Sequence, residues 1–384
     1  MNHAILAVLF WVSGLLLLYI YVGYPALCWM RAKLRPKPWR SAADFRPSVS
    51  IVVAAYNEAN NIRARIANLV AERPSFPLEI LIGSDGSADG TYAAALQAAH
   101  EVAGAGIEVQ VFDFPRGGKI ATLALLLEKA SGEVIVFTDA NCEFAPGALA
   151  AVVARLADPS VGCAGGVKRI GSGHADTAGG ERSYWDFENR LKNWESAFGS
   201  CAGADGALYA IRRRDLPQLV TNRLLADDLY LSLAACREGR RCVLVPEAVV
   251  LESSDTSTGN ELRRKARILA GALPAIAQNR RLLVPRSGLS LPLWSHKVLR
   301  WFSFLPIIGL LVGALGLPSG IAGLFYLGVG ACCAAVLAGF FFPSSLRTKA
   351  VKLPYYFALM NLGQVLGLME WILGDNGPAW EKVR

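Results

Sequence analysis

The first 30 residues contain no Asp, Glu, Lys or Arg, and this block limits the possible folds more than any other feature of the chain. From Ala4 to Met30 it is longer than the ~20 apolar residues that an α-helix needs to cross a bilayer. A secretory signal peptide is the alternative, but the block lacks a basic start and its small-x-small pattern is not followed by a polar mature start. We therefore expect residues 1–30 to be a retained transmembrane anchor.

Two more apolar blocks lie near the C-terminus. Residues 301–342 are uncharged and long enough for two spans joined around Pro318, and residues 353–374 contain one charged residue, Glu370. Gln364 and Glu370 are costly in lipid, so we expect a pore-lining position for such a side chain or a cytoplasmic end for Glu370. If the spans are counted from an external N-terminus, the tail and its basic residues lie outside the cell. The last block can therefore instead be re-entrant or interfacial.

The basic excess lies beside these apolar blocks. The chain has 39 Lys and Arg against 31 Asp and Glu, a net charge of +8, and residues 31–40 (+5) and 343–353 (+3) account for all of it. Basic residues next to spans lie in the cytoplasm, which predicts a multi-pass protein of the inner (cytoplasmic) membrane that contacts membrane lipid. No basic helix with interleaved aromatic residues occurs in the polar region, so we expect no nucleic-acid partner.

Between the apolar blocks, short β-branched runs alternate with alanine-rich stretches, which is typical of a layered α/β domain. The predicted strands cover residues 48–55, 78–83, 107–112 and 134–138, and the predicted helices cover residues 60–70, 92–102, 120–130 and 229–236. The predicted segments are a transmembrane anchor (1–30), a basic linker (31–46), a cytoplasmic α/β domain (47–255), interfacial amphipathic helices (256–300), transmembrane helices (301–374) and a tail (375–384). Ligands bind where the strands of a mostly parallel sheet end, so polar residues there are the candidate site.

Oxygen-bearing side chains stand at these predicted strand ends. Asp139 and Asn141 flank one residue, so on an extended strand end their side chains point the same way and can hold Mg²⁺ or Mn²⁺. For an isolated D-x-N, a strand-ending Asx turn is the simpler interpretation. The chain has no C-x-x-C and no H-E-x-x-H pattern, so any metal must have oxygen ligands. Gly117-Gly118-Lys119 precedes Ile120 instead of Ser or Thr, which excludes a Walker motif.

An ordered series of motifs removes this ambiguity. They are SIVVAAYNE (50–58), SDGSADGT (84–91), RGGK (116–119), FTDAN (137–141), GADGALY (203–209) and ADDL (226–229). Together they resemble the membrane-integrated family 2 glycosyltransferases, which include cellulose, hyaluronan and poly-N-acetylglucosamine synthases, over about residues 45–300. The resemblance implies an α/β GT-A domain with one N-terminal and two to three C-terminal transmembrane helices.

The resemblance also implies roles for individual residues. The implied donor-binding residues are Ala55, Tyr56, Glu58, Asp85, Lys119, Asp139, Asp205, Arg264 and Arg267, the first four at the uracil and ribose of a UDP-sugar and Lys119 near the diphosphate. Asp139 and Asn141 match the family's D-x-D metal motif, with Asn as the second ligand, and imply Mg²⁺ or Mn²⁺ as cofactor. Asp228 matches the general base, with Asp227 replacing the family's Glu, although both residues also suit the positive end of a helix.

Residues 263–268 are a second source of positive charge. They resemble the Q-x-x-R-W motif of the processive synthases, with Arg264 at the Gln, Arg267 at the Arg and Ile268 at the Trp. Arg264 and Arg267 share a helix face and can grip a diphosphate, while a helix that holds anionic lipid is the alternative. The missing Trp belongs to the acceptor site of the polymerising members, so Ile268 favours limited addition.

These residue types suit an inverting transfer. A carboxylate can take the proton of the attacking acceptor hydroxyl, and a divalent ion with fixed cations stabilises the leaving diphosphate. We expect a UDP-sugar donor, a lipid-linked or polysaccharide acceptor and a β-glycosidic product, in exopolysaccharide or glycolipid synthesis. The alternatives are a processive synthase that exports its chain, with a polysaccharide-export or synthase partner subunit, and a catalytically degenerate nucleotide- or glycan-binding subunit.

Three further side chains keep two interpretations each. Trp185 and Trp194 either stack on an acceptor sugar or pack against the protein. His296 either contacts an acceptor or belongs to an aromatic and basic interface anchor.

Overall fold

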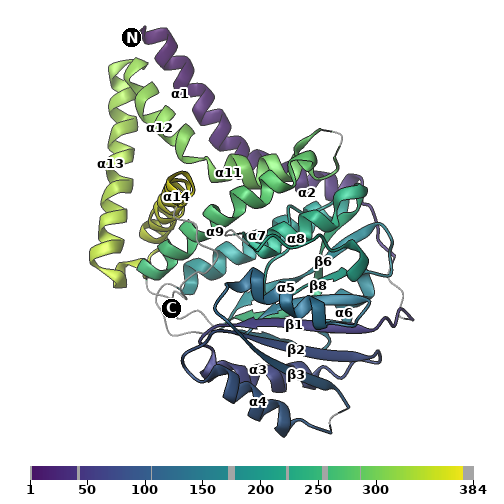
Figure 1. The fold of residues 1–384 in the computed structure, drawn as a ribbon. Coiled ribbons are helices and arrows are strands. Elements are labelled where there is room, and N and C mark those ends of the chain that lie inside the picture. The colour runs from purple at the N-terminus through teal and green to yellow at the C-terminus, as the bar shows by residue number, and fades with distance from the viewer. Residues whose placement is uncertain are drawn as a thin grey trace.

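A mixed sheet with its helices forms one side of the molecule, and long apolar helices form the other (Figure 1). The computed structural model describes residues 2–40, 44–104, 106–171, 178–221, 225–252, 258–285 and 287–374. The predicted tail at 375–384 lies outside the described residues.

The described strands form an eight-stranded sheet in the order β3-β2-β1-β4-β7-β6-β8-β5. They are β1 (Val49–Ala55), β2 (Leu78–Asp85), β3 (Glu108–Phe114), β4 (Val134–Asp139), β5 (Cys142–Phe144), β6 (Val161–Ile170), β7 (Tyr209–Arg212) and β8 (Arg241–Glu252). Strands β1 to β4 are parallel, whereas β7 runs antiparallel to β4 and β6. The chain passes from β1 to β3 on one side and returns to β4 on the other, and this reversal opens a crevice at the carboxyl ends of the strands.

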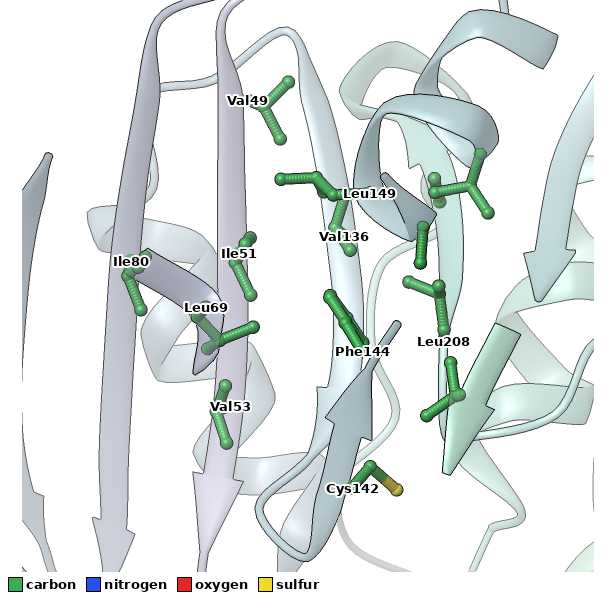
Figure 2. Close-up of a cluster of buried hydrophobic side chains, with 14 of the residues drawn as sticks. Val49, Ile51, Val53, Leu69, Ile80, Val136, Cys142, Phe144, Leu149 and Leu208 are labelled. Carbon is green, nitrogen blue, oxygen red and sulfur yellow. The ribbon is translucent and has the colours of Figure 1, made fainter. Parts of the chain in front are cut away.

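Strand β1 lies at the centre of the core because its side chains are buried on both faces of the sheet. Ile51 and Val53 pack on one face beside Leu69 of a covering helix and Val136 of β4, as Figure 2 shows. Val52 belongs to the hydrophobic cluster on the other face. Each fully buried aliphatic side chain contributes about 1.5–3 kcal/mol to the stability of the fold. This burial holds the carboxyl end of β1 in place beside the ends of β2 and β4.

Seven helices of the described chain lie beside the sheet or join it to the apolar helices. They are α3 (Ala59–Ala71), α4 (Thr91–Glu101), α5 (Lys119–Lys129), α6 (Ala148–Arg155), α7 (Ala178–Phe198), α8 (Asp227–Ala235) and α9 (Thr258–Gln278). The elements predicted within residues 48–138, and the helix at 229–236, are confirmed within two residues at each end. Strands β2 and β4 extend to Asp85 and Asp139, so both carboxylates stand on the last residue of a strand.

The membrane side consists of an N-terminal helix and a C-terminal group. Its elements are α1 (His3–Leu18), a π-helical turn (Tyr19–Gly23), α2 (Tyr24–Leu34), α10 (Ser290–Pro292), a second π-helical turn (Leu293–Val298), α11 (Leu299–Trp301), α12 (Phe304–Gly313), α13 (Ser319–Phe341) and α14 (Lys349–Leu373). Within the described residues, three continuous helices are long and apolar enough to cross a membrane: His3–Leu34, α13 and α14. The pair Ser290–Trp301 and Phe304–Gly316, bent by 58°, adds a fourth candidate. The expected one N-terminal and two to three C-terminal spans are therefore present.

The bent pair of the C-terminal group begins at Ser290, within the segment that the sequence predicts as interfacial helices (256–300). His296 and Arg300 lie in this bent pair and form ion pairs with buried carboxylates of α7. Glu195 Oε1 lies 2.9 Å from His296 Nδ1, and Glu188 Oε2 lies 2.9 Å from the Arg300 guanidinium. Such partners are not visible in the local sequence.

Helix α14 packs closely on α9. A Cβ atom at Gly363 would lie 2.7 Å from Lys265 Cβ, and one at Gly367 would lie 2.4 Å from the Ala266 carbonyl oxygen. Only glycine allows this approach, as is common where membrane helices pack. Helix α9 therefore lies between the sheet and the apolar helices.

Candidate active site

The carboxyl ends of the parallel strands open into a cavity of about 550 Å³, closed on its other sides by α7, α8, α9 and α14. All the predicted site residues line this one cavity: Ala55, Tyr56, Glu58, Asp85, Lys119, Asp139, Asn141, Asp205, Asp228, Arg264 and Arg267. The strand register explains the first group, because Ala54 pairs with Asp139 and Ala55 pairs with Ser84. Segments from residues 55 to 267 therefore converge on a single site.

Asp85 organises one end of the cavity. Its carboxylate is buried, accepts hydrogen bonds from the amides of Gly117 (2.7 Å) and Gly118 (3.0 Å), and forms an ion pair with Arg116. The Arg116 guanidinium in turn lies 3.5 Å from the centre of the Tyr56 ring. Asp85 thus holds the loop before α5 against the end of β1 and places a cation on one face of Tyr56.

Glu58 stands at the N-terminal end of α3, at the same end of the cavity. It is buried, and its carboxylate accepts a hydrogen bond from the Asn61 amide at 2.7 Å. Its backbone N–H donates to the Thr91 hydroxyl at 2.8 Å. The bond to Thr91 links the segment that follows β1 to the segment that follows β2 at this end of the cavity.

Lys119 joins two carboxylates at the centre of the cavity. Its Nζ lies 2.8 Å from Asp139 Oδ1 and 3.0 Å from Asp227 Oδ2. Burial disfavours the ammonium form, but Asp139 and Asp227 raise the pKa of Lys119 overall. The residue therefore carries a fixed positive charge at the start of α5, where the helix dipole also attracts anions.

The two residues of the D-x-N motif differ in their surroundings. The side chain of Asp139 is 33% exposed. A Cβ atom at Gly206 would lie 3.3 Å from Asp139 Oδ2 and 3.7 Å from Asp228 Oδ2, so both oxygens face the same small space. The Asn141 amide donates to Glu252 at 3.3 Å, and its carbonyl oxygen accepts a hydrogen bond from the Cys142 thiol at 3.8 Å.

A hard divalent ion fits this donor set. Within the described residues, no group of three or more His, Cys, Asp and Glu side chains could hold a metal ion. Mg²⁺ and related ions often take only one or two protein oxygens and complete their shell with phosphate and water. Asp139 and the Asn141 carbonyl supply such a partial shell, so a metal here would depend on the diphosphate of the ligand.

Asp228 lies on the first turn of α8 beside this space. Its oxygens accept hydrogen bonds from the amides of Leu229 (2.7 Å) and Gly206 (3.1 Å). Burial and the nearby carboxylates of Asp227 and Asp205 raise the pKa of Asp228 to about 6. A carboxylate with this pKa is a better proton acceptor than a free Asp and is still mostly ionised at neutral pH.

Arg264 and Arg267 face the strand ends from α9. Arg264 is held by Glu261, whose Oε2 lies 2.9 Å from its Nε. Burial and the neighbouring Arg264 lower the pKa of Arg267, which stays charged and is attracted by Asp139 and Asp227. Ile268, at the position of the family's Trp, also lines the cavity.

Two protein-family models match the part of the chain that contains these residues. The Glycosyl transferase family 2 model matches residues 50–219, and the Glycosyl transferase family group 2 model matches residues 135–343, more than half of the chain. The chain is a family 2 glycosyltransferase.

Relatives and solved structures agree with this membership. The chain is 24% identical to an N-acetylglucosaminyltransferase of Sinorhizobium fredii over 236 residues, covering 58% of this chain and 56% of the relative. It is 31% identical to glycosyltransferase AglE of Haloferax volcanii over 97 residues, covering 25% of this chain and 31% of that protein. The chain thus matches about half or less of the length of these relatives.

A solved structure matches nearly the whole fold. Mannosyltransferase PcManGT from Pyrobaculum calidifontis, in complex with GDP-Man and Mn²⁺, has a TM-score of 0.70 at 24% identity. The match covers 95% of this chain and 99% of that one. The GT-A-like mixed sheet and the helices around it are therefore shared, including the membrane side.

Some residues that line the cavity of this glycosyltransferase were not predicted from the sequence to be site residues. Lys168, Glu188, Lys192 and Glu252 also line the cavity, as do Trp185 and His296, for which the sequence left an acceptor contact open, and Gln364. The spacing of charged residues on α7 could have indicated this group, because positions 188, 192 and 195 share one helix face. His296 contacts two of them, at 3.0 Å from Glu188 Oε1 and 2.9 Å from Glu195 Oε1.

Proposed function

We propose that this protein is a membrane-bound inverting glycosyltransferase that moves a sugar from a UDP-sugar to a lipid-linked or polysaccharide acceptor and forms a β-glycosidic bond. The observation that carries the proposal is the position of Asp228. This carboxylate lies beside the space that Asp139 Oδ2 also faces, in a cavity that is lined both by sheet ends and by helices of the membrane side. A base and a diphosphate-binding region thus meet next to the bilayer.

The reaction follows from these groups. As the acceptor hydroxyl attacks the anomeric carbon, Asp228 takes its proton, and the bond from that carbon to the diphosphate oxygen breaks with its electron pair. Lys119, Arg264 and Arg267 stabilise the charge that develops on the departing nucleoside diphosphate. A Mg²⁺ or Mn²⁺ ion held by Asp139 and Asn141 would neutralise part of the same charge. A single displacement inverts the anomeric centre, so an α-linked donor gives a β-product.

The nucleotide is the first point to test. The resemblance to UDP-sugar enzymes supports uracil recognition by Ala55, Tyr56, Glu58 and Asp85, whereas the structurally similar mannosyltransferase holds GDP-Man and Mn²⁺. Tyr56 lines the cavity, and the Arg116 guanidinium already covers one face of its ring at 3.5 Å from the ring centre. We propose uracil and treat guanine as the competing outcome.

The location of the acceptor follows from the helices. We propose that residues 47–255 form a cytoplasmic domain, that 256–300 lie at the interface and that the flanking apolar helices span the inner membrane. Met360 and Gln364 of α14 line the cavity, so a lipid-linked acceptor can reach Asp228 from the bilayer. Ile268 favours limited addition over export of a long chain through a partner subunit.

The test is a donor panel with the purified full chain in detergent. UDP- and GDP-sugars are supplied with Mn²⁺ or Mg²⁺, and nucleoside diphosphate release and product length are measured together. Wild type should release UDP, and Asp228→Asn should reduce transfer by about 10²–10⁴-fold while it still binds UDP. Asp186→Asn, an exposed residue of α7, is the matched control.

Two results would contradict the proposal. Turnover of GDP-sugars alone would overturn the UDP assignment and keep the enzyme. No turnover of any donor with either metal would overturn the catalytic role and favour a binding subunit.

A further inference from the structure

Helix α7 brings three charged side chains to one buried face. Glu188, Lys192 and Glu195 are 3%, 3% and 0% exposed. Glu195 accepts hydrogen bonds from the Tyr24 hydroxyl (2.5 Å) and the amide of Ala202 (3.3 Å), and it contacts His296. The negative charge of Glu195 is thus fully satisfied by the surrounding protein.

Glu188 is likewise satisfied. Its Oε2 lies 2.9 Å from the Arg300 guanidinium, and its Oε1 lies 3.5 Å from Lys297 Nζ and 3.0 Å from the His296 ring. Burial opposes ionisation, but His296 and Lys297 hold the pKa of Glu188 well below its usual range. Lys297, Arg300 and His296 therefore share Glu188 as a carboxylate partner.

Lys192 differs from both of its neighbours on α7. Its side chain lines the cavity, and the described residues include no hydrogen-bond or ion-pair partner for its Nζ. Burial opposes the ammonium form, but Glu188 and Asp205 raise the pKa of Lys192 overall, so the residue stays charged. A buried ammonium with unused donor capacity is costly unless a ligand supplies acceptors.

Trp185 and Asp205 complete this region. The Trp185 indole Nε1 is buried and lacks a hydrogen-bond partner among the described residues, although the ring lines the cavity. Asp205 also lines it, and one of its oxygens accepts a hydrogen bond from the amide of Ala207 at 3.1 Å. Gly206, the next residue, donates to Asp228 at 3.1 Å, so this region adjoins the base.

We propose that the part of the cavity lined by Trp185, Lys192 and Asp205 is the acceptor subsite and that it binds an uncharged sugar ring. Lys192 and the Trp185 N–H donate hydrogen bonds to ring hydroxyls, and Asp205 accepts one, which leaves a neighbouring hydroxyl facing Asp228. This inference rests on the proposed function and names the class of acceptor.

The mixture of cations and carboxylates in this region favours a neutral sugar over a phosphate. Lys192 faces Glu188 and Asp205, Lys297 and Arg300 contact Glu188, and Lys168 and Lys297 also lie near enough to Asp205 to lower its pKa. A phosphate here would meet carboxylates on two sides, whereas hydroxyls can both donate and accept. The ring can belong to a glycolipid headgroup or to a soluble glycan end, and the experiment separates these sources.

The test measures acceptor affinity on the full chain in phosphatidylcholine nanodiscs with UDP and Mn²⁺. Dissociation constants are determined by calorimetry for dodecyl β-glucoside, dodecyl N-acetyl-β-glucosaminide, their methyl counterparts and dodecyl phosphate. At least one glycoside should bind more tightly than dodecyl phosphate. Preference for a dodecyl over a methyl glycoside identifies a glycolipid, and equal affinity identifies a glycan end.

The variants locate the subsite. Lys192→Met should weaken binding of the preferred glycoside by about tenfold or more, because a hydrogen bond to a charged group is lost. Lys192→Arg should restore part of the affinity, and Trp185→Phe should weaken binding while the ring is kept. Arg190→Met changes an exposed basic residue of the same helix and should leave affinity unchanged. UDP affinity, measured for each variant, reports whether the donor side stays folded.

The inference can fail while the proposed function holds. Tighter binding of dodecyl phosphate, no binding of any glycoside, or unchanged glycoside affinity in Lys192→Met with UDP binding intact would overturn it. The donor panel would still report sugar transfer in each of these cases. If the donor panel fails instead, the glycoside affinities still decide whether the subsite recognises a sugar.

Discussion

Gly206 offers a sharp test of the reaction centre, because its hydrogen atom points into the space between the charged groups. An alanine Cβ at this position would lie 3.3 Å from Asp139 Oδ2, 3.6 Å from Lys119 Nζ and 3.7 Å from Asp228 Oδ2. The backbone of Gly206 is not in the left-handed region, so alanine can adopt it without strain. The substitution therefore adds one methyl group where the donor, the metal and the base should meet.

The expected effects on stability and activity differ widely. The nearest atoms are ends of flexible side chains, so Gly206→Ala should change the free energy of unfolding by less than about 1 kcal/mol. A displacement of reacting groups by a few tenths of an ångström to 1 Å costs up to about 10²-fold in rate. We expect kcat/KM to fall about 10²-fold, equivalent to about 2.7 kcal/mol of transition-state stabilisation.

The assay measures nucleoside diphosphate release and thermal unfolding on the same preparation. Gly199→Ala is the matched control, because its added Cβ would lie 3.9 Å from the nearest atom, the Glu195 carbonyl oxygen. Full activity of Gly206→Ala would refute the placement of the reaction at Asp139 and Asp228. A large loss of stability would refute the argument that the methyl group affects only the reacting groups.

Three further predictions concern pH, metal and packing. With a pKa of about 6, Asp228 is protonated below pH 6 and ionised above it, so kcat/KM should fall tenfold per pH unit below about pH 6 and be level above pH 7; a flat profile down to pH 5 would contradict this. EDTA should abolish transfer, and Mn²⁺ or Mg²⁺ should restore it, whereas activity that persists in excess EDTA would exclude a role for Asp139 and Asn141 in metal binding. Gly363→Leu should destabilise the protein by about 1–3 kcal/mol in thermal unfolding, because its Cβ would lie 2.7 Å from Lys265 Cβ; the same change at Gly328, which has open space, should have little effect.

The sheet edge of the site could be predicted from sequence because its signals are local. β-branched runs end at polar residues, and parallel strands bring their carboxyl ends to one edge without any knowledge of tertiary contacts. Asp85 and Asp139 were thus expected together and stand on the last residues of β2 and β4. What the local sequence could not predict is how Asp85 is used, because Arg116 and the amides of Gly117 and Gly118 occupy its oxygens.

The α7 region could not be predicted for a different reason. Glu188, Lys192 and Glu195 have the spacing of an ordinary polar helix face, which is usually exposed. Their burial depends on partners far away along the chain: Tyr24 lies 171 residues from Glu195, and His296 lies 101 residues from it. Long-range pairing of this kind leaves no periodic signal in either segment.

The same ion pairs explain why the apolar helices form one wall of the cavity. The bent helix carries three polar side chains that are unusual in a membrane helix: His296, Lys297 and Arg300. They form ion pairs with Glu188 and Glu195, which attach the bent helix to α7. On the other side of the cavity, the glycines of α14 hold α9, which carries Arg264 and Arg267. The elements that attach the domain to the apolar helices are therefore also the elements that shape the cavity. The geometry of the cavity around Asp228 therefore depends on both attachments.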